Sequence, residues 1–302
     1  MWRVTILRTA LVGLGDIAQK AYLPVLAARA DITPVLVTRN AETLRRVGSQ
    51  YRLPEQYTDL AAAIESGLDA AFVHVATEAH VAVVTQLLAA GVPVFVDKPL
   101  ADTYADAAAI ADAAVAAGVP LMVGFNRRYA PAYAEIAQWP QRDIVVMQKN
   151  RTGPQDDVRR SVFDDFIHVV DTVRFLGPPV ATAAVSGAVV DGRLQHVVIT
   201  LTDGVRSATG VMNRTAGLSE ESLEVFAPGR KRRVINVSEV VDLAGGEQLT
   251  RRDEWRSVGV QRGFAPMCQT FLDGVRGGPM PDLDDAVRTH LMCEQIIAAL
   301  TG

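Results

Sequence analysis

The sequence predicts an α/β fold with two domains. An N-terminal domain, residues 1–125, is expected to contain a parallel sheet, and an α+β domain, residues 126–302, a mostly antiparallel open sheet. Two observations predict this division. Short apolar runs alternate with helix-like stretches up to about residue 125, as in parallel sheets covered by helices. Farther on, apolar and polar residues alternate between turn signals, as in antiparallel strands.

The first domain is expected to contain five strands separated by helices. The expected strands are 10–12, 34–37, 70–75, 92–96 and 121–123. Their runs are almost wholly apolar, which indicates burial on both faces. The expected helices are 17–30, 41–50, 59–66, 79–90 and 104–117, the last of them rich in alanine, the strongest helix former.

The second domain is expected to be built largely from hairpins. Asp191-Gly192 and Asp203-Gly204 lie between alternating runs, and Asp-Gly in that setting is a strong hairpin signal. The basic run 230–233 is interpreted as a solvated hairpin. The expected strands are 143–150, 180–190, 194–202, 205–212, 222–227 and 233–237, with helices at 160–176, 261–276 and 284–300.

Composition excludes several classes of function. The 302 residues are 49% hydrophobic and carry a formal charge of −4, which does not suit a nucleic-acid-binding surface. The only cysteines, Cys268 and Cys293, are too few and too distant for a metal site or disulfide framework. The chain has no apolar run of membrane-spanning length, and residues 1–8 are too short for a secretory signal. We therefore expect a cytoplasmic protein with no membrane partner and no metal.

A glycine turn, Gly13-Leu14-Gly15-Asp16-Ile17-Ala18, lies between the first strand and the first helix. In such a turn Gly13 permits the tight bend, Gly15 lets the backbone approach a pyrophosphate, and Ala18 lets the helix pack on the sheet. The free N–H groups of the helix favour the anion. The N-terminal part is therefore a Rossmann domain in which Gly13, Gly15, Asp16 and Ile17 are expected to bind a dinucleotide.

The end of the second strand indicates which dinucleotide binds. NAD-specific domains usually have an acid there, about 20 residues after the glycines, whereas this chain has Thr38-Arg39-Asn40. Arg39 can bind a 2′-phosphate and stack on adenine. NADP(H) is favoured and NAD(H) stays possible, and the alternative is that Arg39 is an exposed loop residue.

Two further segments contain residues suited to acid–base chemistry. Lys98 follows the strand 92–96, and the carboxyl ends of parallel strands are where such sheets bind ligands. Asp164, His168 and Asp171 are spaced i, i+4, i+7, which places them on one face of a regular α-helix. A histidine flanked by carboxylates suits proton transfer near neutral pH, although a surface cluster of acids around a histidine has the same pattern.

Together these segments resemble the glucose-fructose oxidoreductase / inositol dehydrogenase / rhizopine-catabolism (Gfo/Idh/MocA) family, and in particular its virulence-factor-like oxidoreductase branch. The family motifs occur in the family's order. The matching segments are Gly13–Ala18, Asp97-Lys98-Pro99, Gly124–Tyr129, and Asp164 with His168. Three positions depart from the family pattern. Asp97 stands in place of the usual glutamate, Glu78 in place of a common proline and Phe166 in place of a frequent glycine. These departures leave the identity of the substrate open.

The resemblance implies a role for each matching residue. Lys98 would contact the reacting oxygen and the nicotinamide ribose, His168 would be the general acid/base, Asp164 would orient the substrate, and Asp97 would hold the ribose. Ala76, Thr77 and His80 would line the cofactor. Arg127 is a candidate cofactor contact. Candidate substrate contacts are Arg128, Tyr129, Lys149, Lys98, Asp164 and His168.

Some of these candidates have a structural alternative. The arginines and Lys149 can equally form structural ion pairs. His74 is expected to be a hydrogen-bonded core residue, and Trp255 a core residue that can approach the adenine.

The resemblance implies an NAD(P)-dependent dehydrogenase or reductase acting on CH–OH groups, with a sugar or polyol as its small-molecule substrate. It also implies a homodimer or homotetramer formed through the C-terminal sheet. Two alternatives remain, an NAD-dependent glycosidase and a dinucleotide-sensing regulator without turnover. Regulators of this kind tend to lose the lysine or the histidine, whereas this chain has both.

Overall fold

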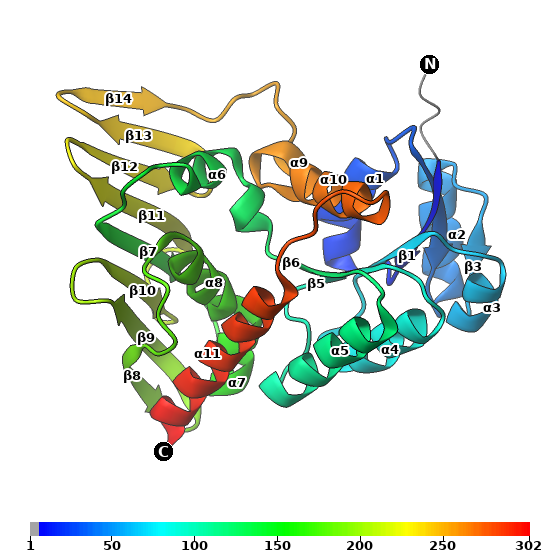
Figure 1. Ribbon diagram of the computed structural model, residues 1–302, viewed down its shortest axis with the longest axis horizontal. Helices are drawn as coiled ribbons and strands as arrows, with labels where there is room; N and C mark the ends of the chain where they lie inside the picture. Colours follow the sequence, from blue (N-terminus) through cyan, green and yellow to red (C-terminus); the bar gives the residue numbers. More distant parts are fainter. Residues whose placement is uncertain (1–5) are drawn as a thin grey trace. The chain divides into compact units, whose positions relative to one another are not determined.

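The computed structural model describes residues 6–302, which form two compact units (Figure 1). The first unit contains the chain up to Gly124 together with Phe264–Asp284. The second contains Phe125–Gly263 and Asp285–Gly302. The expectation that the N-terminus is not a secretory signal rests partly on residues 1–5, which lie outside the described residues.

The first unit is built on a six-stranded parallel sheet with the order β3-β2-β1-β4-β5-β6. This is the Rossmann order, in which the strand sequence reverses between β1 and β4, and ligands bind at that reversal. The short strand β3 was not predicted. The strands are β1 Leu7–Val12, β2 Ile32–Val37, β3 Gln56–Tyr57, β4 Ala70–Val73, β5 Val94–Asp97 and β6 Leu121–Gly124.

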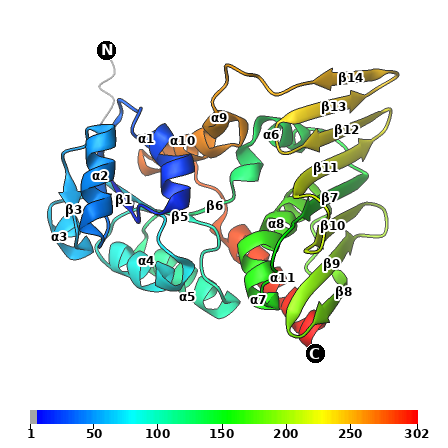
Figure 2. The same ribbon diagram turned by 180° about the vertical axis from the view of Figure 1, so that it is seen from behind.

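Helices cover both faces of this sheet, with α4 and α5 on one face and α1 and α10 on the other (Figures 1 and 2). Asn40, Asp59 and Thr103 cap three of the helices by accepting a hydrogen bond from the first turn. The helices are η1 Ala18–Tyr22, α1 Leu23–Leu26, α2 Ala41–Tyr51, α3 Leu60–Glu65, η2 Thr77–Ala79, α4 His80–Ala89, α5 Tyr104–Ala117 and α10 Phe264–Val275.

Helix α10 differs from the sequence analysis in the unit to which it belongs. The expected helix 261–276 was assigned to the C-terminal domain, whereas α10 packs within the first unit. Its Phe271 meets the rings of Phe72 and Phe95 at centroid distances of 5.1 and 5.8 Å. Arg276, just beyond the helix, pairs with Asp31 at 2.9 Å. Long-range packing of this kind leaves no local signal in the sequence.

The second unit contains an eight-stranded sheet with the order β14-β13-β12-β11-β7-β10-β9-β8. Every pair is antiparallel except β7–β10, so the predicted mostly antiparallel sheet is confirmed. The last two strands were not predicted. The strands are β7 Ile144–Asn150, β8 Ala184–Val190, β9 Arg193–Thr202, β10 Ser207–Asn213, β11 Glu220–Ala227, β12 Arg230–Ile235, β13 Glu239–Leu243 and β14 Glu247–Thr250.

Helices α6, α7, α8 and α11 of the second unit lie on one face of its sheet (Figure 2). The single helix expected at 160–176 is three segments, and its middle segment η4 is a π-helix. Such segments occur often at functional sites. The helices are η3 Asn126–Tyr129, α6 Pro131–Ala137, α7 Val158–Arg160, η4 Ser161–Phe166, α8 Ile167–Leu176, α9 Val258–Gln261 and α11 Leu283–Thr301, which begins in the first unit.

The structure also shows the surroundings of several residues singled out in the sequence. Cys268 and Cys293 are buried free thiols. The basic run lies in the β11–β12 hairpin, although Arg232 is buried and pairs with Asp242. The core position expected for Trp255 is wrong, because this side chain is 97% exposed. Among the described residues, no helix is long and apolar enough to span a membrane, and no cluster of side chains suits a metal ion.

Candidate active site

A pocket of about 480 Å³ lies at the reversal of the first sheet. Its wall comes from the glycine turn after β1, the end of β2, the segment before α3 and the start of α4. The lining therefore includes five of the predicted cofactor contacts, which are Gly13, Gly15, Thr38, Arg39 and Ala76.

The two glycines of the turn have different physical roles. Gly13 has a φ of +89°, and a Cβ there would lie 2.6 Å from the Val75 backbone nitrogen, so only glycine fits. A Cβ on Gly15 would meet nothing within 4 Å, which leaves open space where a pyrophosphate can approach. Ala18 is fully buried. These observations fit a bound dinucleotide.

Arg39 and Thr38 lie at the rim of this pocket. The Arg39 side chain is exposed, and no described residue forms an ion pair or hydrogen bond with it. Asp59 also lines the pocket, but its carboxylate accepts the α3 cap hydrogen bond from the Ala62 N–H at 2.9 Å. The free positive charge at the rim is therefore that of Arg39.

At the end of β5, Asp97 accepts a hydrogen bond of 2.7 Å from the hydroxyl of Tyr22, which lies in the π-helical segment η1. The Tyr22 side chain is fully buried and Asp97 half-buried, and burial raises the pKa of each. Lys98 follows directly and is partly exposed. This hydrogen bond links η1, the helical segment after the glycine turn, to the end of β5, which the predicted catalytic residue Lys98 follows.

The two histidines near this strand end differ in their surroundings. The ring nitrogens of His80 lie 2.8 Å from the Pro99 carbonyl oxygen and 3.1 Å from that of Val75. This buried ring therefore links the segment after Lys98 to the end of β4. The expectation of a hydrogen-bonded His74 is wrong, because neither ring nitrogen has a partner among the described residues. Burial, with the charge of His80, lowers the pKa of His74 to about 3.

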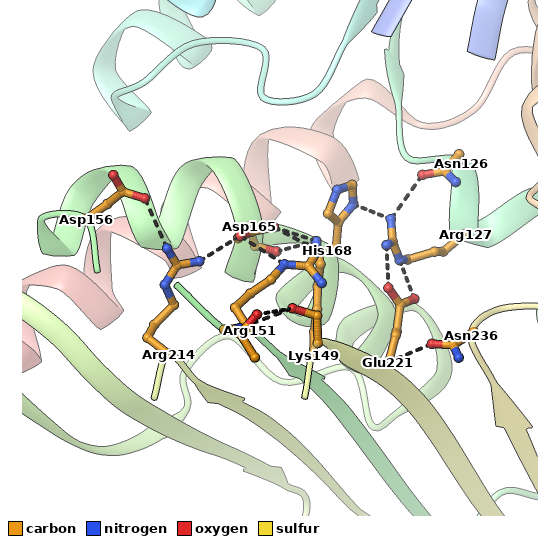
Figure 3. Close-up of polar contacts among 12 residues, drawn as sticks. Asn126, Arg127, Lys149, Arg151, Asp156, Asp165, His168, Arg214, Glu221 and Asn236 are labelled. Atoms are coloured by element: carbon orange, nitrogen blue, oxygen red, sulfur yellow. Dashed lines mark hydrogen bonds and ion pairs between the residues drawn. The ribbon is translucent and has the colours of Figure 1, made fainter. Parts of the chain in front are cut away.

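In the second unit, the side chain of His168 is held by Arg127 (Figure 3). The Arg127 guanidinium donates to His168 Nδ1 at 2.7 Å, to Asn126 at 3.1 Å, and through two hydrogen bonds of 2.7 and 2.6 Å to Glu221. All four side chains are buried. Burial alone would raise the pKa of Glu221, but the charge and hydrogen bonds of Arg127 lower it to about 2.

This contact fixes the tautomer of the histidine. A guanidinium can only donate, so Nδ1 of His168 must present its lone pair. The neutral ring then carries its proton on Nε2. The second unit thus holds a buried histidine whose proton lies on the nitrogen farther from Arg127.

Beside this group, Asp165 is surrounded by cations (Figure 3). Its carboxylate lies 2.8 Å from Lys149, 3.2 Å from Arg151 and 2.9 Å from Arg214. Lys149 is 2% exposed, and burial together with the charge of Arg127 lowers its pKa well below the usual range. The side chain of Lys149 is therefore used in a buried ion pair.

Asp164, His168 and Asp171, which were expected on one helical face, lie in different surroundings. Asp164 lies in the π-helical segment, is about half exposed and pairs with Arg160 at 3.4 Å. Asp171 is buried and accepts hydrogen bonds from Arg128. The i, i+4, i+7 argument assumed a regular α-helix, whereas a π-segment closes its hydrogen bonds at i+5 and shifts the faces.

The other candidate substrate contacts are also partly occupied. Arg128 pairs with Asp171 at 2.5 Å and with Asp285 at 2.7 Å, and its guanidinium lies over the rings of Phe125 and Phe175. Tyr129 is half-buried, and burial raises its pKa to about 12. Among the predicted cofactor contacts, Asp16 pairs with Lys20 on the surface, Ile17 is exposed just before η1, and Thr77 is half-buried at the start of η2.

The sequence analysis missed Glu221, Asn126 and Arg214, each of which holds another side chain of this group. A signal existed for Glu221, because it falls in phase with Leu223 and Val225 on the buried face of β11. A glutamate at such a position needs a buried cation. The sequence does not tell which cation that is.

Comparison with known proteins gives the class. A family model described as an oxidoreductase family with an NAD-binding Rossmann fold matches residues 7–125. A second, of a YceM-like C-terminal domain, matches residues 131–243. The chain therefore belongs to the Gfo/Idh/MocA family and is an NAD(P)-dependent oxidoreductase.

One curated relative and two solved structures match this chain over nearly its whole length. YceM of Salmonella typhimurium is 35% identical over 97% of both chains. A Gfo/Idh/MocA family oxidoreductase from Vibrio cholerae superimposes with a TM-score of 0.91 at 29% identity over 97% of both chains. The dehydrogenase MviM from Clostridium difficile gives 0.90 at 28% identity, over 97% of this chain and 99% of that one.

Proposed function

We propose that this oxidoreductase reversibly transfers a hydride between NADP(H) and a carbonyl or secondary alcohol of a sugar or polyol, with Lys98, Asp164 and His168 as catalytic residues. Two relatives that match part of the chain support the substrate class by their names. They are inositol 2-dehydrogenase of Gluconacetobacter diazotrophicus, 31% identical over 45% of this chain, and D-apiose dehydrogenase of Paraburkholderia graminis, 32% over 57%.

The observation that carries the proposal is the hydrogen bond from Arg127 to His168 Nδ1. It leaves the proton on Nε2, from which the neutral imidazole can donate it to a forming alkoxide, while the charge of Arg127 stabilises the imidazolate that remains; in the reverse direction that imidazolate takes the proton from the alcohol. Lys98, a cation after β5, is proposed to hydrogen-bond the reacting oxygen. Asp164 is proposed to orient the substrate.

When bound, the dinucleotide supplies or accepts the hydride. The pocket at the sheet reversal would hold it, with Gly13 and Gly15 leaving space for the pyrophosphate and Asp97 for the ribose. His80 supports that region by bridging Val75 and Pro99. Because their guanidinium and ammonium groups are already paired, Arg127, Arg128 and Lys149 are proposed to act mainly by holding other side chains.

The preference for NADP(H) is supported by Arg39. Its exposed guanidinium has no partner among the described residues and lines the pocket, so it can bind a 2′-phosphate bidentately. Arg39→Ala should narrow the difference in affinity between NADPH and NADH. Fluorescence titration measures both affinities, and Arg45→Ala, on the exposed side of α2, is the control. Wild-type protein that binds NADH at least as tightly would contradict the preference.

The proposed activity is tested with a panel of sugars, polyols and their oxidised forms, following the absorbance of NADPH. Net formation or consumption of NADPH that depends on the substrate is the expected result. Sugar cleavage without net redox change would instead indicate a glycosidase. Tight NADPH binding without turnover on any panel member would indicate a regulator.

We also propose that the open face of the second sheet joins copies of the chain. Val146, Val198, Val211 and Phe226 lie half-buried on strands whose alternate residues are fully buried, so apolar side chains remain on the face without helices. Val198→Lys should convert a dimer or tetramer to smaller species in sedimentation velocity. A wild-type monomer would contradict this.

A further inference from the structure

The side-chain group around Arg127 has more positive than negative charges. Its cations are Arg127, Lys149, Arg151, Arg214 and Arg262, and its acids are Glu221, Asp165 and Asp156. The neighbouring pair of Arg160 and Asp164 adds one charge of each sign. The group therefore has an excess of two cations when all are ionised.

Arg262 is the member of this group that forms no ion pair with a described residue. Each of the other four cations is within 3.2 Å of a carboxylate oxygen. No described residue forms a hydrogen bond or ion pair with the Arg262 guanidinium, although the residue is half-buried. Burial and the charge of Arg127 lower its pKa, as expected of a cation placed beside another cation.

The backbone holds Arg262 in this position. Its carbonyl oxygen accepts a hydrogen bond of 2.8 Å from Asn126, the residue before Arg127. Gly263, with a φ of +83°, lies so close to the same turn that a Cβ would overlap the Asn126 oxygen and the Ala130 nitrogen. The backbone of this unpaired arginine is thus held against the turn that carries Arg127, the arginine that holds His168.

An unpaired, partly desolvated cation is unfavourable unless a ligand supplies the opposite charge. We propose that the substrate carries an anionic group, a carboxylate or a phosphate, and that Arg262 binds it. A guanidinium suits either group because it can donate two parallel hydrogen bonds. This inference rests on the proposed function for the identity of the reacting site, and it narrows the substrate class from sugars in general to sugar acids or sugar phosphates.

The test compares neutral and anionic ligands of the same skeleton by calorimetry in the presence of NADPH. The pairs are D-galactose with D-galacturonate, and glycerol with glycerol phosphate, so the two arms separate carboxylate from phosphate. At least one anion should bind about tenfold to a hundredfold more tightly than its neutral partner, as one charge-assisted hydrogen bond supplies. High ionic strength should reduce the difference.

Arg262→Gln should remove most of that difference while leaving NADPH affinity unchanged. Because Arg262 has no protein partner, the variant should be at least as stable as the wild type in thermal unfolding, whereas loss of a structural arginine would lower the melting temperature. Arg206→Gln is the matched control, since Arg206 pairs with Asp203 in the β9–β10 hairpin. It should change neither affinity.

Two results would overturn the inference. One is that no anion of the panel binds more tightly than its neutral partner, and the other is that Arg262→Gln keeps the full preference. Calorimetry needs no turnover, so the two proposals fail separately. Anion binding without redox turnover would contradict the proposed function alone, and turnover of neutral sugars with no preference for anions would contradict this inference alone.

Discussion

Glu221→Gln tests the pairing that holds the histidine. Glu221 is 6% exposed, and its carboxylate takes two of the four hydrogen bonds of Arg127. The amide has nearly the same shape but no charge. The variant therefore leaves the buried guanidinium without a counter-charge, a loss that typically costs about 3–5 kcal/mol.

The pH dependence of the free energy of unfolding gives a second numerical expectation for the pairing of Glu221 with Arg127. The pKa of Glu221 is lowered from 4.5 to about 2 in the folded protein. A lowered carboxyl pKa stabilises the folded state above the unfolded value, and the stabilisation is lost as the pH falls toward the folded value. The shift corresponds to something on the order of 3 kcal/mol, of which about 2 kcal/mol is lost by pH 3.

Urea unfolding of the wild type and of Glu221→Gln at several pH values measures the difference between their free energies of unfolding. The wild type should be the more stable at pH 7, and the difference should shrink by about 2 kcal/mol between pH 5 and pH 3. Glu220→Gln, at the exposed neighbouring position, should show no such trend. A difference that stays constant with pH, or that grows on acidification, would refute the pairing of Glu221 with Arg127.

Three further predictions concern the proposed roles. Lys98→Met should lower kcat and kcat/KM together while the fold and the NADPH affinity persist, and near-normal turnover would remove Lys98 from the mechanism. Asp164→Asn should slow turnover with little effect on stability, because Asp164 is half-exposed, whereas Asp165→Asn should chiefly lower the urea midpoint, because three cations lose their counter-charge. If the Asp164 variant turns over normally, its assignment is wrong. Gly13→Ala should weaken NADPH binding and lower stability, since its Cβ would meet the Val75 nitrogen, while Gly91→Ala, in a turn with open space, controls for the strain of a positive φ.

The first unit could be predicted well because its signals are local. Apolar runs and the glycine turn each act within a few residues, and the five predicted strands are all present, in a parallel sheet whose order places the glycine turn at the reversal. The pocket contacts at Gly13, Gly15 and Arg39 follow from that order. The position of α10 could not be predicted, because its packing on Phe72 and Phe95 joins residues nearly 200 positions apart.

The second unit could be predicted in outline only. Hairpin signals gave most strands, but the π-helical segment Ser161–Phe166 has no recognisable sequence signal, and it displaced Asp164 from the face expected for it. Glu221, Arg127 and His168 come from three separate elements. Their contact depends on the register of β11 against β7, which is set by tertiary packing.

The central claim is that His168 transfers the proton in a hydride-transfer reaction. It is tested most directly by kcat of His168→Ala on the best substrate of the panel, measured across the pH range beside NADPH affinity. We expect a loss of about 10²–10⁴-fold in kcat and a flattened pH–rate profile, with unchanged NADPH binding. Turnover within a few-fold of wild type and an unaltered pH–rate profile would contradict it.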